Sequence, residues 1–314
     1  MNIKKTFGSI ALFLAAVIWG FAFVAQTSGA ENIPTFTFNF LRSYIAFIFL
    51  AVLIALLSLK KPDIIPRTKE SKKSLVIGGI CCGIALFVAT SFQQYGIGLY
   101  PEDAGASGRS GFITALYVVI VPCVSALIFR KRIHIAVWCG VLIAVAGMYL
   151  LCFSGGISKL YIGDLMIFLC ALSFCGHILV VDHFVKKSNG ILLSCIQFLT
   201  MGTLSLIAML IFENPSIDAI MDSVIPILYL GIMSSGVAYT LQVVGQKHTD
   251  PTVASILMSL ESVFAVIGGW LILHERLSAK ELVGCALVFL AIIVAQMPGF
   301  GKKNKAPQSV NVTE

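Results

Sequence analysis

Long apolar stretches separated by short polar segments recur along the whole chain. A helix needs roughly 20 apolar residues to cross a bilayer core of about 30 Å. The sequence supplies a stretch of about this length ten times, which predicts about ten transmembrane helices. The expected spans are residues 7–25, 36–59, 74–96, 105–129, 135–153, 162–181, 190–212, 223–244, 252–273 and 281–297.

The composition places the chain in a membrane. Of its residues, 58% are hydrophobic and 12% are charged, whereas a soluble domain carries roughly a quarter charged residues. We therefore expect an all-α membrane protein in contact with the lipid bilayer. The 314 residues are enough for one compact bundle, so a monomer would suffice. The net charge of +7 comes from short basic runs between the apolar stretches, which excludes a nucleic-acid-binding face.

The basic residues predict an orientation. Of the 22 lysines and arginines, 17 fall in segments on the side of the N-terminus and three in segments on the other side; Arg42 and Arg109 lie within spans. Because cytoplasmic loops are enriched in lysine and arginine, we expect a multi-pass protein of the cell (inner or plasma) membrane with both termini in the cytoplasm. The first apolar stretch resembles a signal peptide, but its length favours a retained helix.

An internal repeat divides the spans into two sets of five. A shift of 155 residues pairs Gly8 with Gly163, Trp19 with Phe174 and Arg42 with Gln197. A shift of 149 residues pairs Gln93 with Gln242 and Gly96 with Gly245. A shift of 144 residues pairs Arg132 with Arg276 and Gly140 with Gly284. Five is odd, so the second copy must cross the membrane in the opposite sense. We predict a five-helix repeat over 1–156, an inverted copy over 157–300, and a polar cytoplasmic tail over 301–314. Inverted repeats build many secondary transporters, with the substrate cavity between the halves.

Short motifs strengthen this interpretation. They are Ala16-Val17-Ile18-Trp19-Gly20, Phe40-Leu41-Arg42, Leu260-Glu261-Ser262-Val263-Phe264-Ala265 and His274-Glu275-Arg276-Leu277-Ser278 with Gly284. In their order and spacing they resemble the EamA-type proteins of the drug/metabolite transporter (DMT) superfamily. The resemblance implies ten helices that move small metabolites such as amino acids, driven by gradients and without a bound cofactor. Ser262 stands where this family often has proline, so we expect a kink beside Glu261 to be lost.

Three ionisable residues within the spans are the strongest candidates for a site, because a charge in a membrane is costly and usually faces an interior cavity. Arg42 and Arg109 lie toward the outer ends of their spans and suit an anionic group on the substrate. Glu261 lies near the centre of its span and suits a substrate amine or a coupling proton. The alternative is a buried structural pair between Glu261 and one arginine.

Polar and aromatic residues complete the predicted cavity. The candidates are Trp19, Gln93, Tyr117, Gln197, Tyr239 and Gln242, with Asn39 and Gln94 beside them. Gln93 with Gln242, and Arg42 with Gln197, occupy equivalent places in the two copies. Small residues at the start of the fourth span and from Gly231 to Ala238 predict close helix packing or a sliding surface. Asp103 and Asp250 are expected to cap helices.

The residues favour a secondary transporter of small metabolites, and we expect an exporter of amino acids or similar polar solutes that works by alternating access. Two alternatives stay open. His177 and Asp182 have the spacing of a base and its orienting carboxylate in some membrane acyltransferases, and an uncoupled channel would share the same helices. The nine cysteines include no Cys-x-x-Cys, so we expect neither a metal site nor a redox pair.

Overall fold

A computed structural model describes residues 3–30, 33–60, 64–66, 68–101, 106–128, 130, 132–152, 161–272 and 279–296. The predicted cap Asp103, the motif from His274 to Ser278 and the tail over 301–314 lie outside the described residues.

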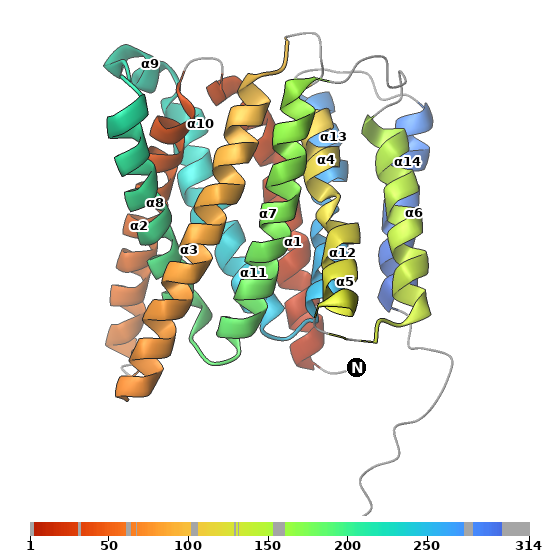
Figure 1. Ribbon diagram of the computed structural model, residues 1–314, viewed down its shortest axis with the longest axis horizontal. Helices are drawn as coiled ribbons and strands as arrows, with labels where there is room; N and C mark the ends of the chain where they lie inside the picture. The colour runs from red at the N-terminus through yellow and green to blue at the C-terminus, as the bar shows by residue number, and fades with distance from the viewer. Residues whose placement is uncertain are drawn as a thin grey trace, which may run out of the picture.

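The described chain forms a bundle of helices that run side by side (Figure 1). In chain order they are α1 (Ile3–Ala30), α2 (Thr35–Lys60), α3 (Lys69–Gly98), α4 (Ala106–Ala115), α5 (Tyr117–Leu127), α6 (Ile135–Cys152), α7 (Ile162–Val185), α8 (Gly190–Phe212), α9 (Ile217–Asp222), α10 (Val224–Leu228), the π-helix η3 (Tyr229–Ala238), α11 (Tyr239–Gln246), α12 (Pro251–Met258), α13 (Glu261–Ile272) and α14 (Ala279–Gln296).

Eight helices of the described chain are long and apolar enough to cross a membrane, when the continuous helix pairs are joined. They are α1, α2, α3, α4 with α5, α7, α8, α10 through α11, and α12 with α13. Two shorter apolar helices lie within α6 and α14, over Ile135–Leu150 and Leu282–Ala295. The all-α membrane class is therefore confirmed, and the count of ten, which needs both shorter helices, stays a prediction.

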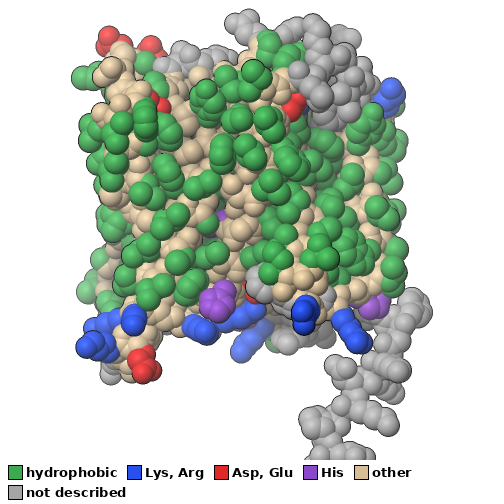
Figure 2. All heavy atoms as spheres, viewed as in Figure 1, with side chains coloured by type: hydrophobic (Ala, Val, Ile, Leu, Met, Phe, Trp, Pro, Cys, Tyr) green, Lys and Arg blue, Asp and Glu red, His purple; other side chains and the backbone are tan. Residues whose placement is uncertain are grey.

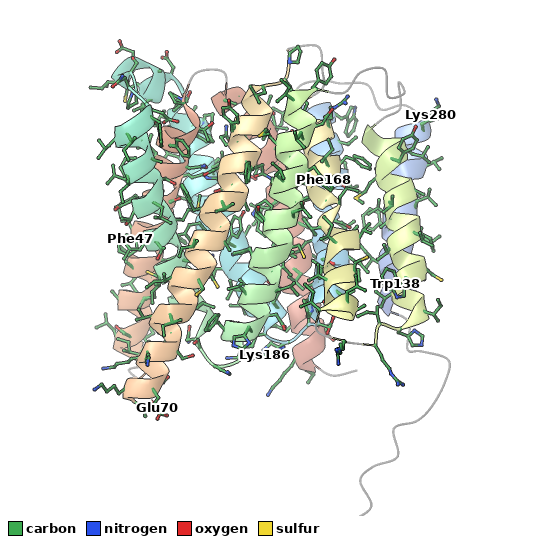
Figure 3. All side chains as sticks on the ribbon, in the orientation of Figure 1. Phe47, Glu70, Trp138, Phe168, Lys186 and Lys280 are labelled. Atoms are coloured by element: carbon green, nitrogen blue, oxygen red, sulfur yellow. The ribbon has the colours of Figure 1, made fainter. Side chains whose placement is uncertain are left out.

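Charged side chains gather at the two ends of the bundle, and apolar side chains cover the belt between them (Figure 2). We call one end the basic end; its described residues include Lys4, Lys60, Lys72, Lys73, Arg132, Lys186, Lys187 and Lys247. Figure 3 places Lys186 and Glu70 there and Lys280 at the opposite end. We call the opposite end the acidic end, after Asp164, Glu213, Asp218 and Asp222. The grouping of the predicted basic segments at one end is thus observed.

The two predicted halves interlock. The most extensive helix contacts all join one half to the other: α6 with α14, α3 with α7 and with α8, α2 with α8, and α1 with α13 (Figure 1). The main apolar core draws buried residues from both halves, among them Leu12, Phe38, Phe198 and Met201. Packing between the halves, rather than within each one, therefore holds the bundle together.

Two spans are interrupted at equivalent positions. The first break falls between α4 and α5, just before Tyr117, and the second between α12 and α13, just before Glu261. At both breaks the backbone forms tighter bonds to the third residue back, from Leu116 N to Ile113 O (3.2 Å) and from Leu260 N to Leu257 O (3.4 Å). The expectation that Ser262 would straighten the helix beside Glu261 is therefore wrong.

Serine side chains give the physical reason for the second break. Ser255, Ser259 and Ser262 each donate a hydrogen bond to the carbonyl three residues earlier, at 2.7 to 2.8 Å. Such bonds compete with the helix ladder and often bend helices. A run of serines thus disturbs this helix without proline.

The small residues from Gly231 to Ala238 pack against α2. A Cβ atom on Gly231 would lie 2.6 Å from the side chain of Ile45, and one on Gly236 would lie 2.8 Å from the ring of Phe49. This run forms η3, whose π-helical winding is a form that often occurs at functional sites.

The predicted cap Asp250 is confirmed, since its carboxylate accepts a 2.9 Å hydrogen bond from Thr252 N.

Glycines related by the repeat close the two ends of the bundle. At the basic end, α1 and α11 approach so closely that a Cβ atom on Gly8 would lie 2.9 Å from the carbonyl oxygen of Gly245. At the acidic end, a Cβ atom on Gly163 of α7 would lie 2.8 Å from the carbonyl oxygen of Gly96 in α3. The sequence shifts of 155 and 149 convert the first pair into the second.

Candidate functional site

A polar cavity lies inside the bundle where the two halves meet. Its volume is about 30 Å³, room for about two water molecules, which is less than a metabolite needs. The lining residues are Trp19, Ala22, Phe23, Gln26, Arg42, Gln93, Thr114, Tyr117, Phe174, Ile178, Ser234, Tyr239, Gln242, Met258 and Glu261. Seven of the nine predicted site residues are among them, and their role in binding stays a prediction.

Arg42 brings a positive charge to the cavity. It lies on α2, is 2% exposed, and has a buried Nε without a hydrogen-bond partner. Among the described residues, no carboxylate forms an ion pair with it. A buried guanidinium is costly unless it is paired, so this side chain is suited to receive an anionic group from a ligand.

Glu261 brings a negative charge from α13. It is 5% exposed, and its Oε1 accepts a 2.9 Å hydrogen bond from the hydroxyl of Tyr117, which is 3% exposed. The sequence shift of 144 residues places Tyr117 on Glu261, so the two copies contribute the bonded partners from the same position. Within the described chain, the alternative pairing of Glu261 with Arg42 or Arg109 is not formed.

Aromatic rings form one wall of the cavity. The indole of Trp19 meets the ring of Tyr239 edge to face, with centroids 4.7 Å apart. Tyr239 also contacts Phe198 and His177, at 5.6 and 6.0 Å between centroids. The indole Nε1 of Trp19 is buried without a hydrogen-bond partner among the described residues. The wall thus offers apolar surface and one available donor.

The repeat-related glutamines lie toward opposite ends of the cavity. Gln93 accepts a 3.1 Å hydrogen bond from Gln26 and donates a 3.3 Å bond to Thr114, on helices that end or begin at the acidic end. Gln242 donates a 3.1 Å bond to Gln246, near the basic end of α11. The Oε1 of Gln242 is buried without a partner in the described structure. Gln242 therefore offers a ligand one acceptor, whereas the oxygen and the nitrogen of the Gln93 amide each have a partner already.

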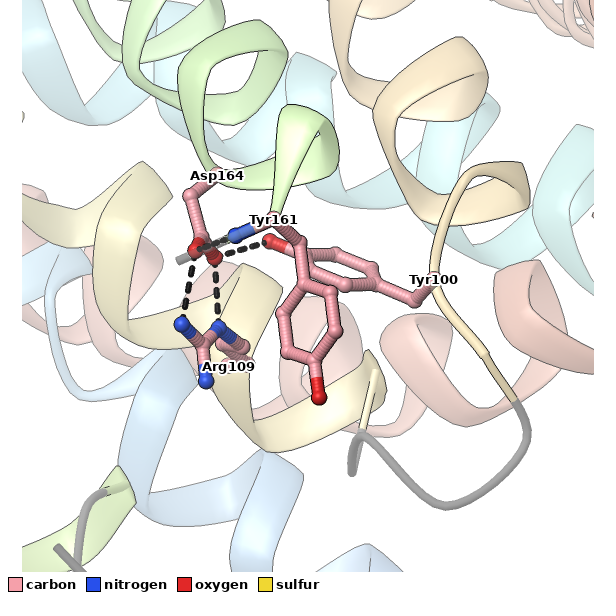
Figure 4. Close-up of polar contacts among 4 residues, drawn as sticks. All are labelled: Tyr100, Arg109, Tyr161 and Asp164. Carbon is pink, nitrogen blue, oxygen red and sulfur yellow. Dashed lines mark hydrogen bonds and ion pairs between the residues drawn. The ribbon is translucent and has the colours of Figure 1, made fainter. Parts of the chain in front are cut away.

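The structure places Arg109 outside the cavity, at the acidic end of the bundle. Its Nε and one terminal nitrogen donate to the two carboxylate oxygens of Asp164, at 2.5 and 2.6 Å (Figure 4). The guanidinium carbon also lies 4.9 Å from the centre of the Tyr161 ring. Asp164 already neutralises Arg109, so a substrate anion would have to compete for it.

Gln197 also lies outside the cavity. It is fully buried on α8, and its Oε1 lies 3.2 Å from Nε2 of His177. Asp182 instead lies 2.8 Å from the ammonium group of Lys186. His177 and Asp182 therefore have separate partners, and the structure does not bring them together as a base and its orienting group. Asn39 and Gln94 are buried but do not line the cavity.

Sequence reasoning missed several lining residues and one partner. Gln26 lies two helical turns after Trp19, and Thr114 lies one turn before Tyr117, so a search by helical spacing from the predicted residues would have found both. Asp164 lies at the third position of its helix, where its carboxylate also accepts a 2.8 Å bond from Tyr161 N. That position is typical of a capping residue, so the sequence does not indicate that Asp164 pairs with Arg109.

An all-helical membrane bundle that encloses a polar cavity between two interlocked halves is the architecture of a membrane transporter. A model of the EamA-like transporter family matches residues 6–153 and 161–297, and the chain belongs to this family.

Similar proteins agree with this assignment. An uncharacterized transporter of Archaeoglobus fulgidus is 28% identical over 94% of this chain and 88% of its own length. The uncharacterized transporter YoaV of Bacillus subtilis is 26% identical over 93% of this chain and 96% of its own. A solved crystal structure matches with a TM-score of 0.73 over 92% of this chain and 96% of that chain, at 20% identity, and supports the fold alone.

Proposed function

We propose that this protein is a gradient-driven exporter of amino acids or similar small polar solutes, which bind in the cavity between Arg42 and Glu261. The observation that carries the proposal is the buried guanidinium of Arg42, which lines the cavity and has no carboxylate partner within the described chain. A substrate carboxylate would supply the paired hydrogen bonds that a guanidinium is shaped to give.

Glu261 suits the other end of such a solute. Its carboxylate lines the same cavity and is held by the hydroxyl of Tyr117. A substrate ammonium group could bind there, or a proton could take its place when the substrate leaves. We propose that Glu261 is the coupling-proton site, because proton and substrate would then compete for one carboxylate.

The small cavity and the close helix contacts at the two ends of the bundle support alternating access. The glycine contacts Gly8–Gly245 and Gly96–Gly163 hold helices together at the two ends, and the cavity between them is small. An open pore would need a wider space between these helices, so the geometry favours a carrier over an open channel. Electrical recording separates the two: single-channel current steps would support a channel, whereas saturable counterflow without steps supports a carrier.

The orientation that we propose has both termini in the cytoplasm of a cell whose inner or plasma membrane holds the protein. The support is the concentration of lysine and arginine at the basic end (Figure 2). Export then moves the solute from the basic end to the acidic end. Inside-out vesicles would accumulate the solute when energised, and uptake confined to right-side-out vesicles would contradict the proposed direction.

A thermal-shift experiment on the purified protein tests the substrate class. A ligand that binds only the folded state raises the melting temperature. We expect stabilisation by certain amino acids, and none by the corresponding amides, which lack the carboxylate. Arg42→Gln should abolish the stabilisation, whereas Arg132→Gln, at an exposed position of the basic end, should leave it unchanged. Stabilisation by apolar cations alone would overturn the proposal.

A further inference from the structure

The cluster around Asp164 at the acidic end joins three helices that line the cavity one to three turns deeper. Asp164 belongs to α7 and Arg109 to α4, and Tyr100 follows the last turn of α3. The cavity residues on the same helices are Gln93, Thr114, Phe174 and Ile178. Arg109 precedes Thr114 by five residues, Tyr100 follows Gln93 by seven, and Asp164 precedes Phe174 by ten. The cluster therefore lies about 8 to 15 Å nearer the acidic end at 1.5 Å per residue.

The cluster is fully connected (Figure 4). Besides the two bonds from Arg109, the carboxylate of Asp164 accepts a 2.8 Å bond from the Tyr100 hydroxyl and a 2.8 Å bond from Tyr161 N. The side chains of Arg109 and Asp164 are only 10% and 13% exposed. Burial and the neighbouring carboxylate raise the pKa of Tyr100, so its hydroxyl keeps the proton that it donates.

The cluster crosses between the two halves of the chain. Arg109 and Tyr100 belong to the first half and Asp164 to the second, beside the close contact of Gly96 with Gly163. Any movement of α4 away from α7 would break the ion pair between Arg109 and Asp164. Bonds of this kind are strong only when water is excluded and both partners are in place.

The sequence repeat does not copy the three side chains of this cluster to the other end of the bundle. The shifts of 155, 149 and 144 residues carry Asp164, Tyr100 and Arg109 to Ser9, Thr249 and Val253. A Cβ atom on Gly8 would lie 2.7 Å from the Thr249 hydroxyl, so Thr249 occupies the place at the basic end that Tyr100 occupies beside Gly163. The packing is therefore repeated, whereas these three side chains could not form an ion pair with one another.

We propose that Arg109, Asp164 and Tyr100 form a latch that closes the cavity at the acidic end, so that Arg109 gates the solute pathway rather than binding the solute. This inference rests on the proposed function only because it takes the cavity to be the solute pathway. Its opening can be measured without any substrate.

Cys170 reports on the gate. It is fully buried on α7, beside Thr114 of the cavity wall. The experiment measures its reaction with a membrane-impermeant maleimide in right-side-out and inside-out vesicles, followed by peptide mass spectrometry, which separates it from the other cysteines. An added cysteine at the exposed position of Asp218 identifies the face of the acidic end.

The test variant combines Arg109→Gln with Asp164→Asn. It removes both charges of the ion pair, so that neither charge is left buried without its partner. We expect Cys170 to react at least tenfold faster from the face of the acidic end and at an unchanged rate from the other face. The matched control, Arg132→Gln with Asp222→Asn, removes the same charges at exposed positions and should change nothing. Tyr100→Phe removes one hydrogen bond and keeps the ion pair, so it should raise the Cys170 reaction rate by only a few fold. This variant provides the test if the double variant does not fold.

Two results would overturn the latch. One is a Cys170 rate within twofold of the unsubstituted protein in both test variants. The other is an equal rise at Cys82, which is fully buried on α3 between α7 and α8 and away from the cavity, because that result means general loosening. If labelling changes as expected but no solute is carried, the latch stands and the proposed function fails. If solute is carried but labelling does not change, the proposed function stands and the latch fails.

Discussion

The hydroxyl of Tyr117 donates a 2.9 Å hydrogen bond to the carboxylate of Glu261, and the predicted repeat places the two residues at the same position of its two copies. Each lies directly after the interruption of its helix. The broken helices of the two halves therefore meet through these side chains at the cavity.

We expect Tyr117→Phe to slow transport by roughly tenfold or more, because losing a hydrogen bond to a charged group costs about 1.5–3 kcal/mol. Flux into proteoliposomes under a proton gradient measures the effect. Tyr44→Phe is the control, since the Tyr44 hydroxyl lies on the exposed side of α2, 3.4 Å from Thr203. Full activity of Tyr117→Phe would show that the bond between the copies is dispensable.

Glu261→Gln tests the proposed coupling site. A glutamine keeps the size of the side chain and cannot take up or release a proton in the transport cycle. We expect proton-driven accumulation to be lost while counterflow of bound solute continues, and Glu70→Gln, at an exposed position of α3, should behave as the unsubstituted protein. Proton-driven uptake at the full rate in Glu261→Gln liposomes would rule out this site.

Glu213 holds the start of α2 from the end of α8. Its two carboxylate oxygens accept hydrogen bonds from Phe36 N and Thr37 N, both at 2.7 Å, and from the Thr37 hydroxyl at 2.8 Å. We expect Glu213→Ala to destabilise the fold by about 1–3 kcal/mol, since a helix start and a charged acceptor are both lost. Thermal unfolding in detergent gives the measurement, and an unchanged melting point would contradict it. Asp218→Asn is the exposed control.

The close glycine contacts predict a pair of matched substitutions. Gly8→Ala and Gly163→Ala would each put a methyl group within 3 Å of a backbone oxygen, and we expect a loss of about 1–3 kcal/mol from overpacking. Gly176 has nothing within 4 Å of a Cβ atom, so Gly176→Ala should gain about 0.5–1 kcal/mol from helix propensity. Equal melting points for all three variants would exclude close packing at the two ends.

Much of the fold follows from the sequence because bilayer thickness sets a length that hydropathy can reveal. The spans could be predicted in this way. Residue type and position also predicted the N-cap Asp250 and seven cavity residues, including the repeat-related Gln93 and Gln242. The π-helical winding of η3 could not, because a change in the backbone bonding partner leaves the apolar pattern intact.

The role of Arg109 shows the other limit. A charge within a span indicates a buried partner or a ligand, and sequence separation alone does not distinguish them. The partner, Asp164, lies 55 residues away on a helix that only tertiary packing brings near. Arg42 looks the same in sequence, yet its described surroundings contain no carboxylate that pairs with it.

The interlocking of the halves has a consequence during biosynthesis. Helices α1 to α6 emerge first and meet their principal neighbours only when α7 to α14 follow. Until then the first half leaves the guanidinium of Arg42 and the faces of α2, α3 and α6 exposed to lipid. The membrane must therefore hold a half-made protein whose buried polar groups have not yet met the helices that enclose them.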